Sequence, residues 1–414
     1  MLAATGFYLL KSNVNIEDSK NTLAKNTKTI IEAVKDEAFW ESVRKQYVIS
    51  KAVINLNNGG VSPQPISVQK TYIKNYEFSN EAPTYTMWRQ LDKGREPLRK
   101  QLAEMLGCDA EEVAINRNTP EGLNTIIAGL PIKAGDEVVL TKYDYPNMVN
   151  AWKQRAKRDG VVLKWVDLAL PEEDDEIIVA KFASQINVAT KVVHITHVIN
   201  WTGQILPVQK IANYAKSKGC EVIVDGAHSF AQLNFKINEL NCDYFASSLH
   251  KWLCAPFGTG ILYVKQKNIA KVWSLTASYE SQVDDIRKFE VLGTRSFSAE
   301  MAIEEAINFH SLIGTALKEE RLRYLKNYWL EKVKHFQKVK TYTSLKAQYS
   351  CAIATIGIEG IDASVIEQQL LEKYKIHCTI VKHEQVSGIR ITPHVYTSLS
   401  ELDISVNAIK EMVS

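Results

Sequence analysis

The sequence lacks the features that mark several large classes of protein. Its six cysteines lie far apart, with no C-x-x-C pair and no cysteine–histidine cluster at zinc spacing, so neither a disulfide framework nor a metal site is expected. No apolar run approaches the roughly 18 residues of a membrane-spanning helix. Positive and negative side chains nearly balance, with 50 Lys and Arg against 47 Asp and Glu, so neither nucleic acid nor a membrane is an expected partner.

The composition is that of an ordinary soluble globular protein, with 45% hydrophobic and 23% charged residues. The 414 residues exceed the roughly 250 to 300 at which one hydrophobic core stops growing, so two domains are expected. Reduced thiols favour a cytoplasmic location. Residues 1–10 are apolar, but no basic segment precedes them and no clear cleavage site follows, so export is only the alternative.

Short β-branched runs alternate with longer amphipathic stretches between about residues 111 and 264, a rhythm typical of α/β domains. Seven runs are predicted to be strands: 113–116, 137–140, 161–166, 192–198, 221–224, 244–247 and 260–264. Helix-like sequence, such as residues 207–218, separates several of them. We therefore predict a mostly parallel seven-stranded sheet that is buried on both faces.

The pattern changes after residue 300. It is helical from 301 through about 339, and a smaller α+β unit follows. Its predicted elements are strands near 349–357, at 375–380 and at 388–391, and helices at 363–374 and from 401. The hydrophilic stretch 11–28 is predicted to be an arm or a first helix. We therefore predict that residues 1–60 form an N-terminal arm and part of the small domain, 61–300 the large domain, and 301–414 the small domain.

Residues with chemical potential follow three of the predicted strands, where ligands bind on open parallel sheets. After the first strand, Thr119 suits a helix N-cap and Pro120 the first helical position, which leaves backbone N–H groups free for an anion. Asp225 and His228 follow the fifth strand. The sixth strand leads to Ser248, His250 and Lys251 in an aromatic setting.

An anion site, a carboxylate at a strand end and a lysine after the next strand are together what pyridoxal phosphate requires. On these residues the chain resembles the class V aminotransferase family of pyridoxal-phosphate enzymes (fold type I), and within it the isopenicillin N epimerase-like branch. The resemblance covers about residues 56–401. Its most specific segments are 224–228 and 247–252.

The resemblance implies a role for each matching residue. Lys251 would bind the cofactor as a Schiff base, Asp225 would pair with the pyridinium nitrogen, and His228 would lie beside the phenolic oxygen. The phosphate would be held by Thr119, Ser248 and His250. Tyr143 would stack on the cofactor ring, with Tyr145 as a close rival, and Asn200 would make a polar contact to cofactor or substrate.

The resemblance also implies a second subunit and a substrate site. Thr294 would reach the phosphate of the other subunit, so a homodimer is expected. Arg390 would pair with the carboxylate of a small amino-acid substrate, since its forked guanidinium binds both oxygens. Asn58 would line the same pocket.

Two departures from the family pattern bear on the reaction. Pro120 removes one backbone N–H from the anion site. Cys378 falls in the predicted strand 375–380 rather than on a loop, which indicates a buried structural thiol and not a desulfurase nucleophile. We therefore expect epimerisation at an α-carbon, with transamination or C–S lyase and desulfurase-type activity as the alternatives.

Other readings of the sequence are less favoured. His194 and His197 are expected in the core or at its rim rather than at a metal, because residues three apart on a strand point to opposite faces. A binding protein without turnover would not need Asp225 and Lys251. A dinucleotide-binding oxidoreductase is disfavoured because the only G-x-G, at 258–260, precedes a strand.

Overall fold

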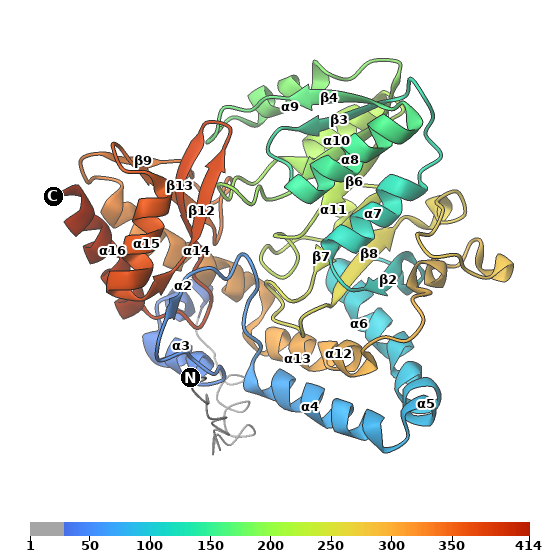
Figure 1. Cartoon of the computed structure of the whole chain (residues 1–414), viewed down its shortest axis with the longest axis horizontal. Coiled ribbons are helices and arrows are strands. Elements are labelled where there is room, and N and C mark those ends of the chain that lie inside the picture. The colour runs from blue at the N-terminus through green and yellow to red at the C-terminus, as the bar shows by residue number, and fades with distance from the viewer. Residues whose placement is uncertain (1–28) are drawn as a thin grey trace, which may run out of the picture.

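The computed structural model describes residues 29–414, so the predicted arm at 11–28 lies outside the described residues. A large part is built around a seven-stranded sheet, and a smaller part with an antiparallel sheet lies beside it (Figure 1). The large sheet has the strand order β2 (Val113–Asn116), β8 (Gly260–Val264), β7 (Tyr244–Ser248), β6 (Glu221–Asp225), β5 (Thr190–Thr196), β3 (Glu137–Thr141) and β4 (Val162–Val166).

All seven predicted strands are present, each within two residues of its expected ends. β8 runs antiparallel to β2 and β7, and the other neighbouring pairs are parallel. The predicted α/β class with a mostly parallel sheet is therefore confirmed.

Helices cover both faces of the large sheet because neighbouring strand residues point in opposite directions. On β3, Val138 packs in a cluster with residues of α7 (Thr119–Gly129) and α8 (Pro146–Asp159). Val139 packs in another cluster, with residues of three helices on the opposite face. These are α6 (Arg95–Leu106), α9 (Asp175–Ala183) and α10 (Val208–Ser217).

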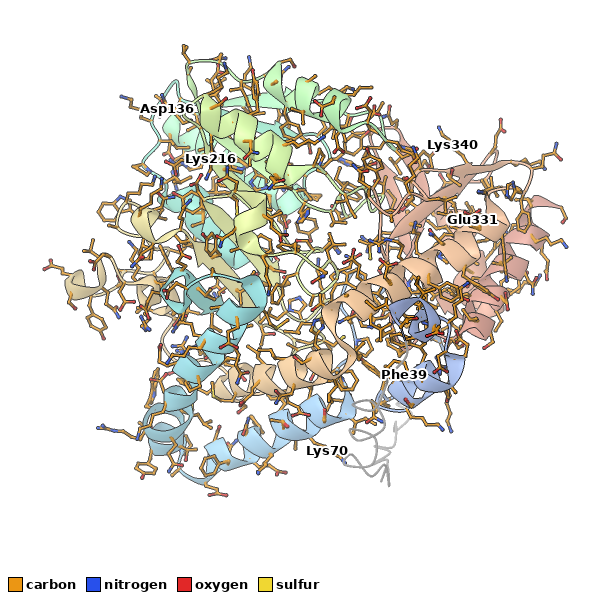
Figure 2. The ribbon with its side chains drawn as sticks, turned by 180° about the vertical axis from the view of Figure 1, so that it is seen from behind. Phe39, Lys70, Asp136, Lys216, Glu331 and Lys340 are labelled. Carbon is orange, nitrogen blue, oxygen red and sulfur yellow. The ribbon has the colours of Figure 1, made fainter. Side chains whose placement is uncertain are left out.

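Shorter elements connect these layers. They are α11 (Ile237–Leu240) and the single turns η3 (Ala110–Glu112), η4 (Gln266–Asn268), η5 (Glu280–Gln282) and η6 (Ile286–Glu290). The N-terminal elements are α2 (Ile30–Val34), α3 (Glu37–Arg44), β1 (Ile54–Asn55), α4 (Ile66–Glu81), α5 (Pro83–Tyr85), η1 (Thr86–Gln90) and η2 (Leu91–Gly94). Figure 2 shows the molecule from behind, where exposed Lys70 marks α4 and exposed Glu331 marks α14 (Thr315–Val333).

The smaller part contains the four-stranded antiparallel sheet β12 (Thr379–His383), β13 (Val386–Ile391), β10 (Ala354–Ile358) and β9 (Val339–Thr341). Its helices are α14, α15 (Ala363–Tyr374) and α16 (Leu399–Val413), and β11 (Ile376–His377) pairs in parallel with β1. Along residues 29–414, no helix combines the length and the apolar character needed to cross a membrane.

Three predictions for this region need correction. The helical stretch 301–339 is interrupted at Gly314, whose φ of 83° breaks the helix, and it ends at Val333. Its elements are α12 (Phe297–Met301), α13 (Ile303–Ile313) and α14, and residue 339 begins a strand. The strand expected near 349–357 starts only at Ala354. The strand expected at 375–380 is divided at Cys378, because β11 pairs with β1 whereas β12 pairs with β13.

Candidate active site

A cavity of about 370 Å³ lies where β5, β6 and β7 end, beside the first turn of α7. Strands β12 and β13 of the smaller part contribute side chains to its wall, so both parts of the molecule form it. The lining residues are Gly59, Gly60, Asn118, Thr119, Pro120, Tyr145, Met148, Thr196, Asn200, Trp201, Asp225, Ala227, His228, Ser248, His250, Lys251, Thr379, Val381 and Arg390.

Lys251 and Asp225 carry opposite charges in this buried environment. Burial lowers the pKa of Lys251 to about 8, and the nearby Asp225 only partly opposes that shift. Asp225 ends β6, its Oδ1 accepts the N–H of Ala227 at 2.9 Å, and burial raises its pKa. Within residues 29–414 no Lys or Arg forms an ion pair with Asp225. The carboxylate therefore suits a cationic ligand group, as a protonated pyridine nitrogen would be.

Hydroxyl groups gather at the first turn of α7. Ser248 Oγ accepts the backbone N–H of Thr119 at 2.9 Å and lies 2.8 Å from Thr119 Oγ1. His250 Nδ1 lies 3.2 Å from the carbonyl oxygen of Thr259, and burial lowers the pKa of His250 to about 4. The two hydroxyl groups beside this helix N-terminus are donors suited to a phosphate.

The helix cap differs by one residue from the prediction. Asn118, not Thr119, is the N-cap of α7: its backbone is extended, and its side chain accepts the N–H of Glu121 at 2.9 Å. Thr119 is therefore the first helical residue and Pro120 the second. The N–H of Thr119 still points out of the helix, towards Ser248.

Arg390 presents a buried cation that has no anionic partner among the described residues, 29–414. Its Nη1 donates to the carbonyl oxygen of Asn200 at 2.9 Å, and its Nη2 donates to Asn57 Oδ1 at 3.1 Å. Both partners are neutral, and burial lowers the pKa of Arg390 to about 10. The Oδ1 atom of Asn200 is also buried without a hydrogen-bond partner in the described part of the chain. The Arg390 guanidinium suits a ligand that carries a carboxylate, whereas the Asn200 oxygen suits a donor such as an ammonium or hydroxyl group.

The structure distinguishes the two candidate tyrosines. Tyr145 lines the cavity, whereas Tyr143 does not; its buried ring meets His383 edge-on, with centroids 5.8 Å apart. Tyr143 lies in the turn after β3, whereas Tyr145 is the N-cap residue of α8. The buried Asp144 between them anchors the turn, because its carboxylate accepts the N–H of Thr141 at 2.8 Å and the hydroxyl of Thr196 at 2.6 Å. This position favours Tyr145 over Tyr143, the preferred sequence prediction, as the residue that would stack on a bound cofactor.

Asn58 and Thr294 also lie outside the cavity of their own chain. Asn58 Nδ2 donates to the carbonyl oxygen of Thr392 at 2.9 Å, and Asn58 Oδ1 accepts the hydroxyl of Tyr396 at 2.6 Å, so its side chain holds two segments together. Its neighbour Gly59 lines the cavity instead. Thr294 is exposed between η6 and α12.

Two wall residues on β12, Thr379 and Val381, were not predicted from the sequence, although the alternation of side chains along a strand would have placed them together. Thr379 and Val381 lie two residues apart on β12 and therefore point to the same face. Trp201 follows Asn200 and stacks on His383, with ring centroids 4.4 Å apart and planes at 11°. No such local signal predicts that stacking, because His383 comes from the other part of the molecule.

The cysteines and the two strand histidines lie outside the wall. All six cysteines fall within the described residues, all are free, and none lines the cavity. Burial raises the pKa of Cys378 to about 12, which opposes thiolate formation. His194 and His197 are buried, and burial lowers the pKa of each to about 4, so both are core histidines.

Fold and site together define a pyridoxal-phosphate enzyme of fold type I. The chain belongs to the aminotransferase class-V family, whose model matches residues 54–404. The family and the cofactor predicted from the sequence, pyridoxal 5′-phosphate, are thereby confirmed.

The individual relatives share only about a quarter of their residues with this chain. Isopenicillin N epimerase of Streptomyces clavuligerus is 25% identical over 88% of this chain and 96% of its own length. A probable cysteine desulfurase of Pyrococcus abyssi is also 25% identical, over 90% of this chain and 97% of its own. The apo structure of cysteine desulfurase from Thermococcus onnurineus NA1 superposes with a TM-score of 0.79 at 24% identity, covering 90% of this chain and 98% of that one. These relatives are named for two different reactions, epimerisation and cysteine desulfuration.

Proposed function

We propose that this class V pyridoxal-phosphate enzyme inverts the α-carbon of an amino acid or of an amino-acid-containing metabolite. The observation that carries the proposal is the composition of the cavity wall: besides Asp225 and two histidines, it holds Lys251 and Tyr145, both able to exchange protons, and no cysteine. Inversion needs one group to remove the α-proton and another to return a proton on the opposite face. Similarity to isopenicillin N epimerase supports the same choice.

Each residue of the wall has a distinct task in this proposal. Pyridoxal phosphate, when bound, supplies an electron sink for the charge left at the α-carbon. Asp225 keeps the ring nitrogen protonated, and Arg390 binds the substrate carboxylate. Lys251, with its pKa lowered to about 8, has enough free amine near neutral pH to remove the α-proton. Tyr145 returns a proton from the other side.

The phosphate would be held by Thr119, Ser248 and His250, and by Thr294 of a second copy of the chain. The exposure of Thr294 and its position outside the cavity of its own chain support a homodimer. Mixing a Lys251→Ala chain with a Thr294→Val chain tests this arrangement. Mixed dimers should regain one intact site, whereas an active monomer in sedimentation would contradict it.

The reaction is tested by incubating single enantiomers of candidate amino acids and peptides in deuterated water. Inversion with deuterium at the α-carbon is expected. Tyr145→Phe should slow inversion by at least about 10²-fold but leave α-proton exchange intact, because Lys251 remains. Tyr143→Phe is the matched control, since this ring lies outside the cavity. Keto-acid release without inversion would make the enzyme a transaminase, and sulfide or pyruvate release would make it a lyase.

A further inference from the structure

Trp252 directly follows Lys251, is completely buried and has no part in the proposed reaction. Its indole N–H donates to Nδ1 of His228 at 3.3 Å. The other ring nitrogen of His228, Nε2, lies 3.2 Å from Nζ of Lys251. Trp252, His228 and Lys251 therefore form a continuous hydrogen-bonded chain that ends in the cavity.

The direction of this chain follows from the protonation of His228. Burial lowers the pKa of His228 well below its ordinary value, so the imidazole is neutral and carries one hydrogen. An indole nitrogen can only donate, so Nδ1 must accept and the hydrogen must be on Nε2. That hydrogen then points at Nζ of Lys251, which has a lone pair to accept it only as the free amine, so the contact favours the free amine over the ammonium form.

We propose that Trp252 is a positioning residue that selects the Nε2–H tautomer of His228 and so keeps the Lys251 amine in its nucleophilic form. The inference rests on the proposed role of Lys251 in binding the cofactor. The same N–H is also a donor suited to the oxygen beside which His228 is expected to lie. Trp252 thus acts on the site only through His228.

The surroundings of Trp252 fix the direction of its N–H. The indole stacks on His394, with ring centroids 5.7 Å apart and planes at 10°. The backbone carbonyl oxygen of Trp252 accepts a hydrogen bond from Nζ of Lys318, a buried lysine of α14 that also contacts His310. The ring therefore has little freedom to turn away from His228.

Loss of the indole donor has a predictable electrostatic consequence. The ring of His228 could then carry its hydrogen on Nδ1, and Nε2 would accept a hydrogen bond from the ammonium form of Lys251. The pKa of Lys251 would rise. Asp225 and Arg390, the charged groups that face Lys251, stay in place, so the change would report on His228 alone.

The test uses Trp252→Phe in the full chain, which keeps an aromatic ring on His394 but removes the donor. In cofactor-free protein with ¹⁵N-labelled histidine, NMR should show Nε2–H for His228 in the natural sequence and a shift towards Nδ1–H in the variant. Added pyridoxal phosphate should attach to Lys251 with an apparent pKa about 0.5 to 1 unit higher in the variant, as expected for one lost hydrogen bond. Attachment near neutral pH should therefore be roughly 3- to 10-fold slower.

His228→Gln is the matched background, because an amide donates an N–H without tautomers. There, Trp252→Phe should not change the attachment pKa further. An Nδ1–H tautomer of His228 in the natural sequence would overturn the inference, and this result does not depend on whether the variant folds. The inference would also fail if Trp252→Phe raised the attachment pKa equally with His228 and with Gln at position 228. If borohydride fixes the cofactor to another lysine, the proposed role of Lys251 fails instead, while the NMR result still decides whether Trp252 selects the tautomer.

Discussion

The two parts of the molecule supply the site in different ways. The large part contributes Asp225, Ser248 and Lys251 from the ends of neighbouring strands, whose register is set by the sheet: Thr196 lies opposite Asp225, and Asp225 opposite Ala246. The smaller part contributes residues of the hairpin formed by β12 and β13, which reaches the large part through its tip.

His383 and Gln385 make the contacts of that tip among the described residues. His383 Nε2 lies 2.7 Å from the carbonyl oxygen of Lys142, and Gln385 Nε2 donates to the carbonyl oxygen of Leu168 at 3.3 Å. The ring of His383 stacks on Trp201 and meets Tyr143 edge-on. The comparison indicates that groups proposed to bind the cofactor belong to a rigid sheet, whereas groups proposed to bind substrate depend on how the hairpin docks. Changes in the two regions should therefore affect different steps.

The largest effect is expected at the strand ends. Lys251→Ala should abolish covalent attachment of pyridoxal phosphate and lower turnover by at least about 10³-fold, because both the attaching amine and the proton acceptor are lost. Peptide mapping after borohydride reduction measures attachment. Lys382→Ala, an exposed lysine of β12, is the control and should behave like the natural sequence. Cofactor on another lysine in the natural sequence would refute the assignment.

Arg390→Lys should weaken substrate binding without changing attachment of the cofactor. The lysine keeps a charge but loses the fork, so KM should rise roughly 10- to 100-fold for a substrate with a free carboxylate, as expected for one charged hydrogen bond. Attachment of pyridoxal phosphate should not change. The carboxamide of the same substrate gives the decisive comparison, because it should show little difference between the two proteins. An equal loss with the carboxamide would show that Arg390 does not bind the carboxylate.

The stability of the large part should depend on pH through His197. Its folded-state pKa of about 4 lies below the ordinary 6.5, so the unfolded chain binds the proton first as pH falls. The contribution of His197 to the free energy of unfolding should therefore be retained above about pH 6.5 and decline towards pH 4, by about 2 kcal/mol at pH 5. His197→Phe should remove this part of the decline in urea unfolding at several pH values, whereas the part due to His194, whose pKa is also about 4, should remain. His335→Gln, at an exposed position, is the control, and equal slopes in all three proteins would contradict the prediction.

The smallest effect is expected at the hairpin tip. His383→Ala removes the stacking on Trp201 and the contact with Lys142, which together are worth about 1 to 2 kcal/mol. KM should rise about 3- to 10-fold while attachment of the cofactor is unchanged. Lys382→Ala, one residue away, again serves as the control. A fall in cofactor affinity in His383→Ala would mean that the two regions are not separable as proposed.

The sequence alone determined those features that depend on neighbouring residues. The seven strands follow from β-branched runs, and Asp225 with His228, and Ser248 with Lys251, are short motifs placed directly after strands. Local capping preferences also located the start of α7 to within one residue. These inferences succeed because strand periodicity and helix capping are set by residues a few positions apart.

Tertiary contacts decided the rest. Tyr145 lines the cavity and Tyr143 does not, and the turn that carries them is anchored by a hydrogen bond from Thr196 to Asp144, 52 residues apart in the sequence. The predicted strand around Cys378 is divided because its two halves pair with different strands, β1 and β13. Arg390 can only be recognised as an unpaired buried cation once its neutral partners, Asn57 and Asn200, are in place. Each outcome depends on hydrogen bonds between segments far apart in the chain, and no local pattern of residue types encodes which segments will meet.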